Sequence, residues 1–154
     1  MIEIKAPQTL PDSKDAKIFL AGSIEMDTAE KWQEKVARAF AGKPVVLINP
    51  RRDAWNNSWS QSESHPEFRK QVEWELDGLA ASDYILMYFD PNTKAPITLL
   101  EMGIYAASGK LFISCPEGYW RKGNVDIVCT RYGIPRFPSL EDVVAHIAAL
   151  VDKR

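Results

Sequence analysis

Glu75 is an acidic residue on the apolar side of a predicted helix, where burial of its carboxylate would cost free energy. At ~100° per residue it falls in the middle of the apolar stripe of a helix expected over residues 67–81. That stripe consists of Phe68, Val72, Leu76 and Leu79. A buried carboxylate needs compensation, and an internal ion pair or a backbone hydrogen bond is one interpretation. We favour the other interpretation, a carboxyl at the edge of a cleft whose raised pKa lets it exchange a proton.

Glu101 is open to a structural and a chemical role. Thr98-Leu99-Leu100-Glu101 fits a capping box, in which the glutamate side chain accepts a hydrogen bond from the Thr98 amide. The same segment follows an apolar run and the Asp90-Pro91-Asn92 turn, so it should lie at the ligand-binding edge of a sheet. The first turn of a helix favours an ionised carboxylate. We therefore expect an ionised Glu101 that can act as a nucleophile.

Other polar residues follow the strands expected at that edge. Gly22 and Ser23 close the first strand before a helix, as in a phosphate-cradling turn, but the G-x-G-x-x-G pattern and the P-loop lysine are missing. Asn49 and Trp55 could hydrogen-bond to a planar base and stack on it, or the aromatic residues of this loop could simply pin it. Arg52, in the same loop, is either a substrate contact or a solvated charge.

These residues are positioned by alternating strands and helices. Apolar runs predict strands at 17–21, 44–48, 83–89 and 110–114. Helices are predicted at 27–41, where Asp27-Thr28-Ala29-Glu30 offers a capping box, and at 67–81, 98–108, 124–132 and 139–151. Strands that are apolar on both faces are typical of a parallel sheet covered by helices. We predict an α/β fold, a Rossmann-like (flavodoxin-like) parallel sheet of about five strands, in one domain over 1–154 with a polar lead-in at 1–16.

The composition narrows the choice of partner. With 154 residues, 45% of them hydrophobic and 26% charged, the chain suits one globular domain. Its net charge of -2 argues against a nucleic-acid partner. No apolar run approaches the ~20 residues that span a bilayer, and the N-terminus does not read as a signal peptide, so we expect a cytoplasmic protein with no membrane contact. The two cysteines and two histidines lack metal-ligand spacing, so we expect no metal site.

Three segments together resemble the nucleoside 2-deoxyribosyltransferase-like family. They are residues 19–24 (Phe-Leu-Ala-Gly-Ser-Ile), residues 75–78 with the following Ser82-Asp83, and residues 100–106 (Leu-Glu-Met-Gly-Ile-Tyr-Ala). The resemblance covers roughly residues 17–134, and its most specific part is the Glu-x-Gly-x-x-Ala pattern that begins at Glu101. It implies a Rossmann-like domain that exchanges the base of a 2-deoxynucleoside through a covalent deoxyribosyl-enzyme ester, with no metal or organic cofactor.

The resemblance also implies roles for individual residues. Glu101 matches the position of the family's nucleophile. Glu75 stands where the family usually has an aspartate that contacts the base and handles its proton, and the glutamate is longer by one methylene. Asp90 lies near a further family carboxylate, after a loop of different length. The family resemblance implies a homo-oligomer in which Asn124 reaches the sugar hydroxyls bound by a neighbouring chain.

Two other functions fit the same residues. A hydrolase of 2-deoxynucleosides or deoxynucleotides would result if water took the sugar from the enzyme. A module that senses a nucleotide without turning it over would use Glu101 only as a helix cap. Glu25 and Asp27, after the first strand, would repel a phosphate, which favours nucleosides over nucleotides. The expected substrates are therefore a 2-deoxynucleoside and a free nucleobase.

Overall fold

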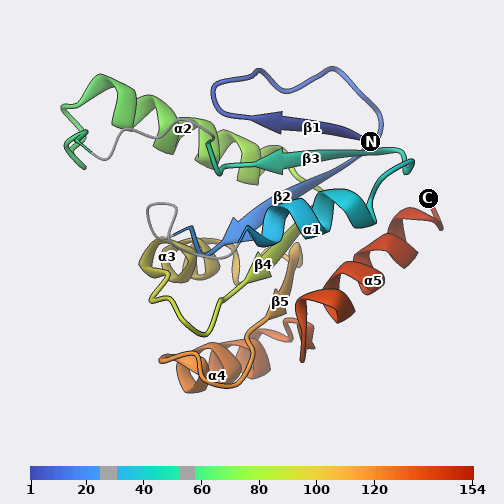
Figure 1. The fold of residues 1–154 in the computed structure, drawn as a ribbon. Coiled ribbons are helices and arrows are strands. Elements are labelled where there is room, and N and C mark those ends of the chain that lie inside the picture. The colour runs from blue at the N-terminus through green and yellow to red at the C-terminus, as the bar shows by residue number, and fades with distance from the viewer. Residues whose placement is uncertain (25–30, 53–57) are drawn as a thin grey trace.

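Six parallel strands form one sheet in the computed structural model, which describes residues 1–24, 31–52 and 58–154. The strands are β1 (Ile2–Lys5), β2 (Ala16–Gly22), β3 (Val45–Asn49), β4 (Tyr84–Tyr88), β5 (Leu111–Ser114) and β6 (Arg136–Phe137). Their spatial order is β1-β3-β2-β4-β5-β6, and every neighbouring pair is parallel. The predicted α/β, flavodoxin-like class is confirmed, with six strands rather than about five (Figure 1).

The two strands that the apolar runs did not predict are the two edges of the sheet. β1 lies in the segment expected to be a polar lead-in, and β6 has only two residues. Each edge strand pairs on one side only, and Ile4 is the one buried residue of the two strands. Without burial on both faces such strands carry no continuous apolar run, so their sequences do not stand out.

Helices cover both faces of the sheet (Figure 1). They are α1 (Trp32–Ala39), α2 (Pro66–Ala81), α3 (Pro96–Tyr105), α4 (Lys122–Tyr132) and α5 (Leu140–Val151). One apolar cluster joins the sheet to α2, α3 and α4, and a second joins its other face to α1 and α5. The five predicted helices are all present, although the capping box expected at residues 27–30 lies outside the described residues.

The strand order creates a switch point between β2 and β4. The chain leaves β2 through α1 to reach β3 on one side, then passes through α2 to reach β4 on the other side of β2. Connections that diverge in this way leave a crevice outside the carboxyl ends of the two strands. Ser23 follows β2 at this edge, and Asp90 follows β4. Ser23 and Asp90 therefore lie at the place where such sheets bind ligands.

The buried face of α2 differs from the predicted stripe. Leu76 is 43% exposed, whereas the buried residues of the helix are Gln71, Gly78 and Leu79. Positions 71, 75, 78 and 79 share one side of a helix, so Glu75 still faces inward. Gly78 brings this side against the sheet, because a Cβ there would lie 2.9 Å from Ile48 Cγ2. The prediction of a partly buried Glu75 is right, but the residues expected around it are partly wrong.

Gly22 permits an equally close contact at the end of β2. A Cβ at this position would lie 2.5 Å from Trp32 Cζ2 and 2.5 Å from the Tyr88 carbonyl oxygen. Real atoms do not approach so closely, and both neighbours are held in the packed interior. Gly22 therefore has a structural role in joining α1 and β4 to the end of β2.

We expect Gly22→Ala to lower the free energy of unfolding by about 1–3 kcal/mol, because the added methyl overpacks a filled site. Gly123→Ala is the matched control, since an added Cβ there meets nothing within 4 Å, and should change stability by less than ~0.5 kcal/mol. Urea denaturation of both variants measures the difference. Equal stabilities would show that Trp32 and Tyr88 can move aside.

Candidate active site

Glu75 lies on α2 and Glu101 on α3, near enough for the charge of Glu75 to act on Glu101. Both helices pack on the same face of the sheet. Burial raises the pKa of Glu75 to about 7, although a hydrogen bond from Gln71 opposes the shift. Burial and the neighbouring charge of Glu75 raise the pKa of Glu101 to about 8. Neighbouring carboxyls do not both ionise readily, so the pair retains a proton near neutral pH.

Glu75 is held by an amide rather than by a cation. Its Oε1 accepts a hydrogen bond from Gln71 Nε2 at 3.0 Å. The same Nε2 donates to the Pro50 carbonyl oxygen at 3.2 Å, and Arg52 Nη1 lies 3.5 Å from Gln71 Oε1. Within 1–24, 31–52 and 58–154, Glu75 takes part in no ion pair. The favoured interpretation, a buried carboxyl with a raised pKa, therefore describes its environment better than an internal ion pair does.

The capping box predicted for Glu101 is not formed. α3 begins at Pro96, two residues before Thr98, and its N-cap is Ala95, whose side chain makes no cap hydrogen bond. Glu101 therefore lies in the second turn, and the first turn holds no acidic residue. Its Oε2 atom is buried and has no hydrogen-bond partner among the described residues. The expectation that Glu101 lies in the first turn was wrong, and burial raises its pKa, which favours the protonated form in the free protein.

Ser23 and Asp90 tie the ends of β2 and β4 together. Ser23 Oγ accepts a hydrogen bond from the Asp90 amide at 3.1 Å and lies 2.6 Å from Thr93 Oγ1. Asp90 Oδ1 accepts a hydrogen bond from the Asn92 amide at 2.9 Å. Ser23, Asp90 and Thr93 are all buried. These bonds shape the crevice at the switch point, and contacts of Gly22, Ser23 and Asp90 with a substrate remain predictions.

The loop that leads into α3 is held from the side of α4. Tyr119 Oη donates to the Lys94 carbonyl oxygen at 2.5 Å, and Trp120 Nε1 donates to the same oxygen at 3.0 Å. The next residue, Ala95, has a left-handed backbone with φ 47°, a conformation that costs a non-glycine residue about 1–2 kcal/mol. Pro96 then starts the helix with a φ already suited to it. These contacts fix where Glu101 enters the site.

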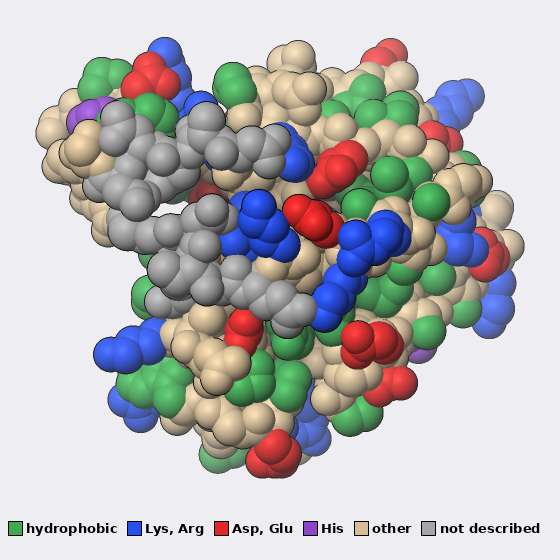
Figure 2. All heavy atoms as spheres, viewed as in Figure 1, with side chains coloured by type: hydrophobic (Ala, Val, Ile, Leu, Met, Phe, Trp, Pro, Cys, Tyr) green, Lys and Arg blue, Asp and Glu red, His purple; other side chains and the backbone are tan. Residues whose placement is uncertain are grey.

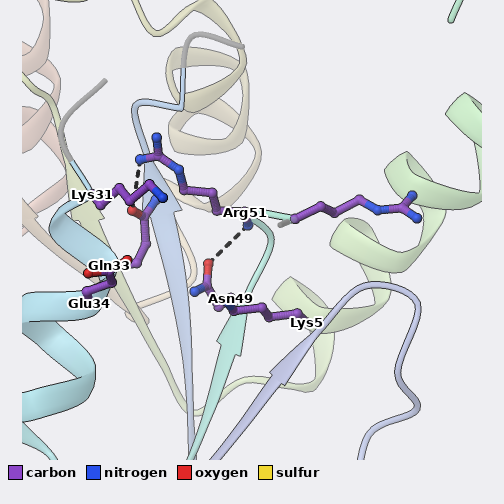
Figure 3. Close-up of a pocket in the computed structure, with 7 residues that line it drawn as sticks. Lys5, Lys31, Gln33, Glu34, Asn49 and Arg51 are labelled. Atoms are coloured by element: carbon purple, nitrogen blue, oxygen red, sulfur yellow. Dashed lines mark hydrogen bonds between the residues drawn. The ribbon is translucent and has the colours of Figure 1, made fainter. Parts of the chain in front are cut away.

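A cavity of about 120 Å³ lies at the carboxyl end of β3 (Figure 3). Asn49 is 3% exposed there; its Nδ2 donates to Glu3 Oε1 at 2.8 Å, and its Oδ1 accepts from the Arg51 amide at 3.0 Å. The cavity is lined by Lys5, Lys31, Gln33, Glu34, Asn49, Arg51 and Arg52. The structure thus brings Asn49 and Arg52 together, as predicted for residues of one loop, while Trp55 lies outside the described residues.

A second cavity, of about 320 Å³, adjoins the first between α2 and the segment that follows β1. Arg52 lines both cavities, and Gln71 lines the second. Glu75 and Glu101 are not among the described residues that line either one. Gln71 connects the second cavity to Glu75, since it lines this cavity and donates a hydrogen bond to the Glu75 carboxyl. Nothing in the helical periodicity pointed to Gln71, because glutamine is read as a surface residue.

Asn124, the remaining predicted contact, is exposed near the start of α4. In the ranges that the structure describes, no group of three or more His, Cys, Asp or Glu side chains could hold a metal ion. None of the described helices is long and apolar enough to cross a membrane.

The fold, Glu75 and Glu101 together define a flavodoxin-like α/β protein in which two buried carboxyls with raised pKa values influence one another. The sequence matches the family model described as nucleoside 2-deoxyribosyltransferase like over residues 15–119, and the chain belongs to this family. The predicted family resemblance is confirmed. A comparison with curated proteins gives no match.

The fold is also similar to the crystal structure of a conserved protein from Enterococcus faecalis V583. The TM-score is 0.63 at 16% sequence identity, over 88% of this chain and 98% of that chain. At this level of identity the likeness shows the fold alone.

The raised pKa values predict how stability changes with pH. The unperturbed value for both glutamates is 4.5, whereas in the folded protein they hold protons up to about 7 and about 8. The folded state binds more protons in this window, so the free energy of unfolding falls as the pH rises from about 4.5 to about 8. The Glu101→Gln variant has no proton to lose at this position. Its free energy of unfolding should therefore fall less over the same pH range, by at least ~1.4 kcal/mol, the free energy that corresponds to one pKa unit.

Urea unfolding at pH 5 and pH 8 measures this difference between the wild type and Glu101→Gln. Glu117→Gln, which removes an exposed carboxyl, is the control and should follow the wild type. If all three proteins lose stability in parallel, Glu101 is not desolvated.

Proposed function

We propose that the protein is a nucleoside 2-deoxyribosyltransferase that exchanges the base of a 2-deoxynucleoside through a covalent deoxyribosyl-Glu101 intermediate. One observation carries the proposal: two desolvated carboxyls with raised pKa values lie together in a chain of this family. Cleavage of a glycosidic bond uses such a pair, one group to protonate the leaving group and one to stabilise or trap the sugar cation. Glu75 takes the first role, and Glu101 takes the second.

The first half-reaction breaks the bond between C1′ and the nitrogen of the base. Protonated Glu75 gives its proton to the departing base, and the Glu101 carboxylate forms a bond to C1′. The step starts from the form in which Glu101 has lost its proton to solvent and Glu75 has kept its own, and the positive charge that develops on the sugar then stabilises the Glu101 carboxylate. A neutral base leaves, Glu75 becomes a carboxylate, and Glu101 becomes an ester.

The second half-reaction reverses these roles. A nitrogen of the incoming base attacks C1′ on the face opposite Glu101, its proton passes to Glu75, and Glu101 departs as a carboxylate. Two inversions at C1′ retain the configuration of the nucleoside. Water in place of the second base would make the protein a hydrolase. No metal or organic cofactor takes part in these steps.

Asn49 and Trp55 are proposed to hold the base, Gly22, Ser23 and Asp90 the sugar, and Arg52 another part of the substrate. The hydrogen bonds of Asn49 to Glu3 and to the Arg51 amide use one N–H and one oxygen lone pair. A primary amide has two of each, so Asn49 keeps one donor and one acceptor for a base edge.

We propose that the working form is a homo-oligomer. α3, which carries Glu101, exposes Ile97, Leu100 and Ile104 by 57%, 60% and 55%. α4, which carries Asn124, exposes Ile127 by 72%. Several exposed aliphatic side chains on neighbouring elements commonly mark an interaction surface. A second copy on this surface would bring its own Asn124 towards the sugar, and sedimentation that finds only monomers would remove this part of the proposal.

We expect Glu101→Gln to reduce the exchange between deoxyinosine and adenine by more than ~10³-fold, because the amide cannot form the ester. Liquid chromatography measures the deoxyadenosine and any free deoxyribose formed. Wild type incubated with a 2-fluoro-2-deoxynucleoside should gain one sugar on the peptide that contains Glu101, as seen by mass spectrometry. Near-normal exchange by Glu101→Gln would exclude this residue as the nucleophile.

For Glu75→Gln we expect a loss of ~10²–10⁴-fold with deoxyinosine, the range attributed to general acid catalysis. A 4-nitrophenyl 2-deoxyriboside should be affected far less, because its leaving group departs without a proton. The ratio of the two rates, measured in the same preparation, separates proton transfer from a loss of structure. Equal losses with both substrates would assign Glu75 a structural role.

A further inference from the structure

A cluster of cationic residues lies beside the carboxyl pair and has no part in the proposed bond cleavage. Among the described residues, Lys5, Lys31, Arg51 and Arg52 line the cavity of about 120 Å³ at the end of β3, and Glu34 is the acidic residue of its lining. Figure 2 shows Lys and Arg side chains gathered near the middle of this face, and Figure 3 shows the cavity itself. The whole chain has a net charge of -2, so the cluster is a local excess of positive charge.

Gln33 adds a buried donor that has no partner within the described part of the chain. The residue is 1% exposed, and its Oε1 accepts a hydrogen bond from Arg51 Nη1 at 3.4 Å (Figure 3). A guanidinium can only donate, so this contact fixes the orientation of the amide and leaves Nε2 as the donor. Gln33 Nε2 is buried and unpartnered among these residues. Such a group costs free energy until an acceptor reaches it.

The cavity suits one small anionic group. Its volume is well below the ~300–1,000 Å³ of cavities that enclose a whole drug-sized ligand. Arginine presents paired N–H groups that match the oxygens of an oxyanion, and lysine adds a mobile charge. α1 begins at this cavity with Lys31 as its N-cap residue, and a helix N-terminus also favours negative charge. A phosphate monoester, with ~-1.5 to -2 charges and three acceptor oxygens, matches several cations and an amide better than a carboxylate does.

We propose that this cavity binds a phosphate monoester group. Arg52 lines it and lies 3.5 Å from Gln71 Oε1, and Gln71 donates to Glu75 at 3.0 Å, so the group would lie within reach of a molecule held at the acid pair. It can be the 5′-phosphate of the substrate, an assignment that rests on the proposed function, or belong to a separate phosphorylated molecule that alters the rate. The sequence argument that Glu25 and Asp27 disfavour a phosphate concerns residues outside the described part of the chain.

Binding is tested first without turnover. Inorganic phosphate is titrated into wild type, Lys31→Met, Gln33→Leu and Lys14→Met, with calorimetry as the readout and circular dichroism to check folding. We expect the first two variants to bind phosphate at least ~10-fold more weakly, since each loses a donor to a charged group. Lys14, an exposed lysine that precedes β2 at the other edge of the sheet, is the control and should bind like the wild type. Lys31 is exposed, so Lys31→Met keeps the test valid even where Gln33→Leu does not fold.

The second measurement identifies the source of the phosphate. Values of kcat/KM are compared for deoxyinosine and deoxyinosine 5′-monophosphate in wild type, Lys31→Met and Lys14→Met. A preference for the nucleotide that falls ~10-fold only in Lys31→Met assigns the phosphate to the substrate. Equal values, with a rate that responds to added ribose 5-phosphate in wild type but not in Lys31→Met, assign it to a separate molecule.

Two results decide between this site and the proposed function. Phosphate affinity that is undetectable in wild type, or equal in wild type, Lys31→Met and Lys14→Met, would overturn the phosphate site. Phosphate binding lost in Lys31→Met, with no turnover of either substrate, would support the site and contradict the transferase.

Discussion

The unfavourable burial of two neighbouring carboxyls is the constraint on which the site depends. Asp83 shows how this fold satisfies a carboxylate: it accepts hydrogen bonds from the Lys17 amide and from Arg154, and these hold its pKa below the ordinary value. Glu75 has an amide partner instead, and Glu101 Oε2 has no partner in the described ranges. The charge of one of these poorly compensated carboxyls, Glu75, acts on the other, and both bind protons more tightly than free glutamate does. Groups kept in this state at a cost in stability are typical of active sites.

The rest of the structure acts to hold that pair in place. Gly78 lets α2 approach the sheet closely enough to bury its inner side, where Glu75 lies. On the other helix, Tyr119 and Trp120 hold the Lys94 carbonyl oxygen immediately before the left-handed Ala95. Backbone strain of this kind persists only where surrounding contacts determine it, and it is common at functional sites. Both helices are therefore positioned by contacts remote from the carboxyls themselves.

The sequence was sufficient for the central strands and for Glu75, because buried strands have continuous apolar runs and a charged residue on an inner helix side breaks the pattern. The sequence was insufficient where a local pattern allowed two different starts for a helix. Thr98 and Glu101 satisfy the capping-box pattern, but Pro96 starts the helix earlier and moves the glutamate into the second turn. Gln71 was missed for a different reason: its burial is explained by hydrogen bonds to segments distant in sequence, which helical periodicity does not represent.

Gln71 determines which oxygen of Glu75 can carry the acidic proton. Its Nε2 donates to both Glu75 Oε1 and the Pro50 carbonyl oxygen, and its Oε1 faces Arg52 Nη1, so the amide has one orientation. Glu75 Oε1 must then be an acceptor, which leaves Oε2 to hold the proton. Once that proton has moved to a leaving base, the hydrogen bond from Gln71 still stabilises the carboxylate that forms. Burial keeps the pKa of Glu75 high enough for proton donation, because the neutral amide of Gln71 opposes that shift only in part, whereas a cation in the same place would lower the pKa further.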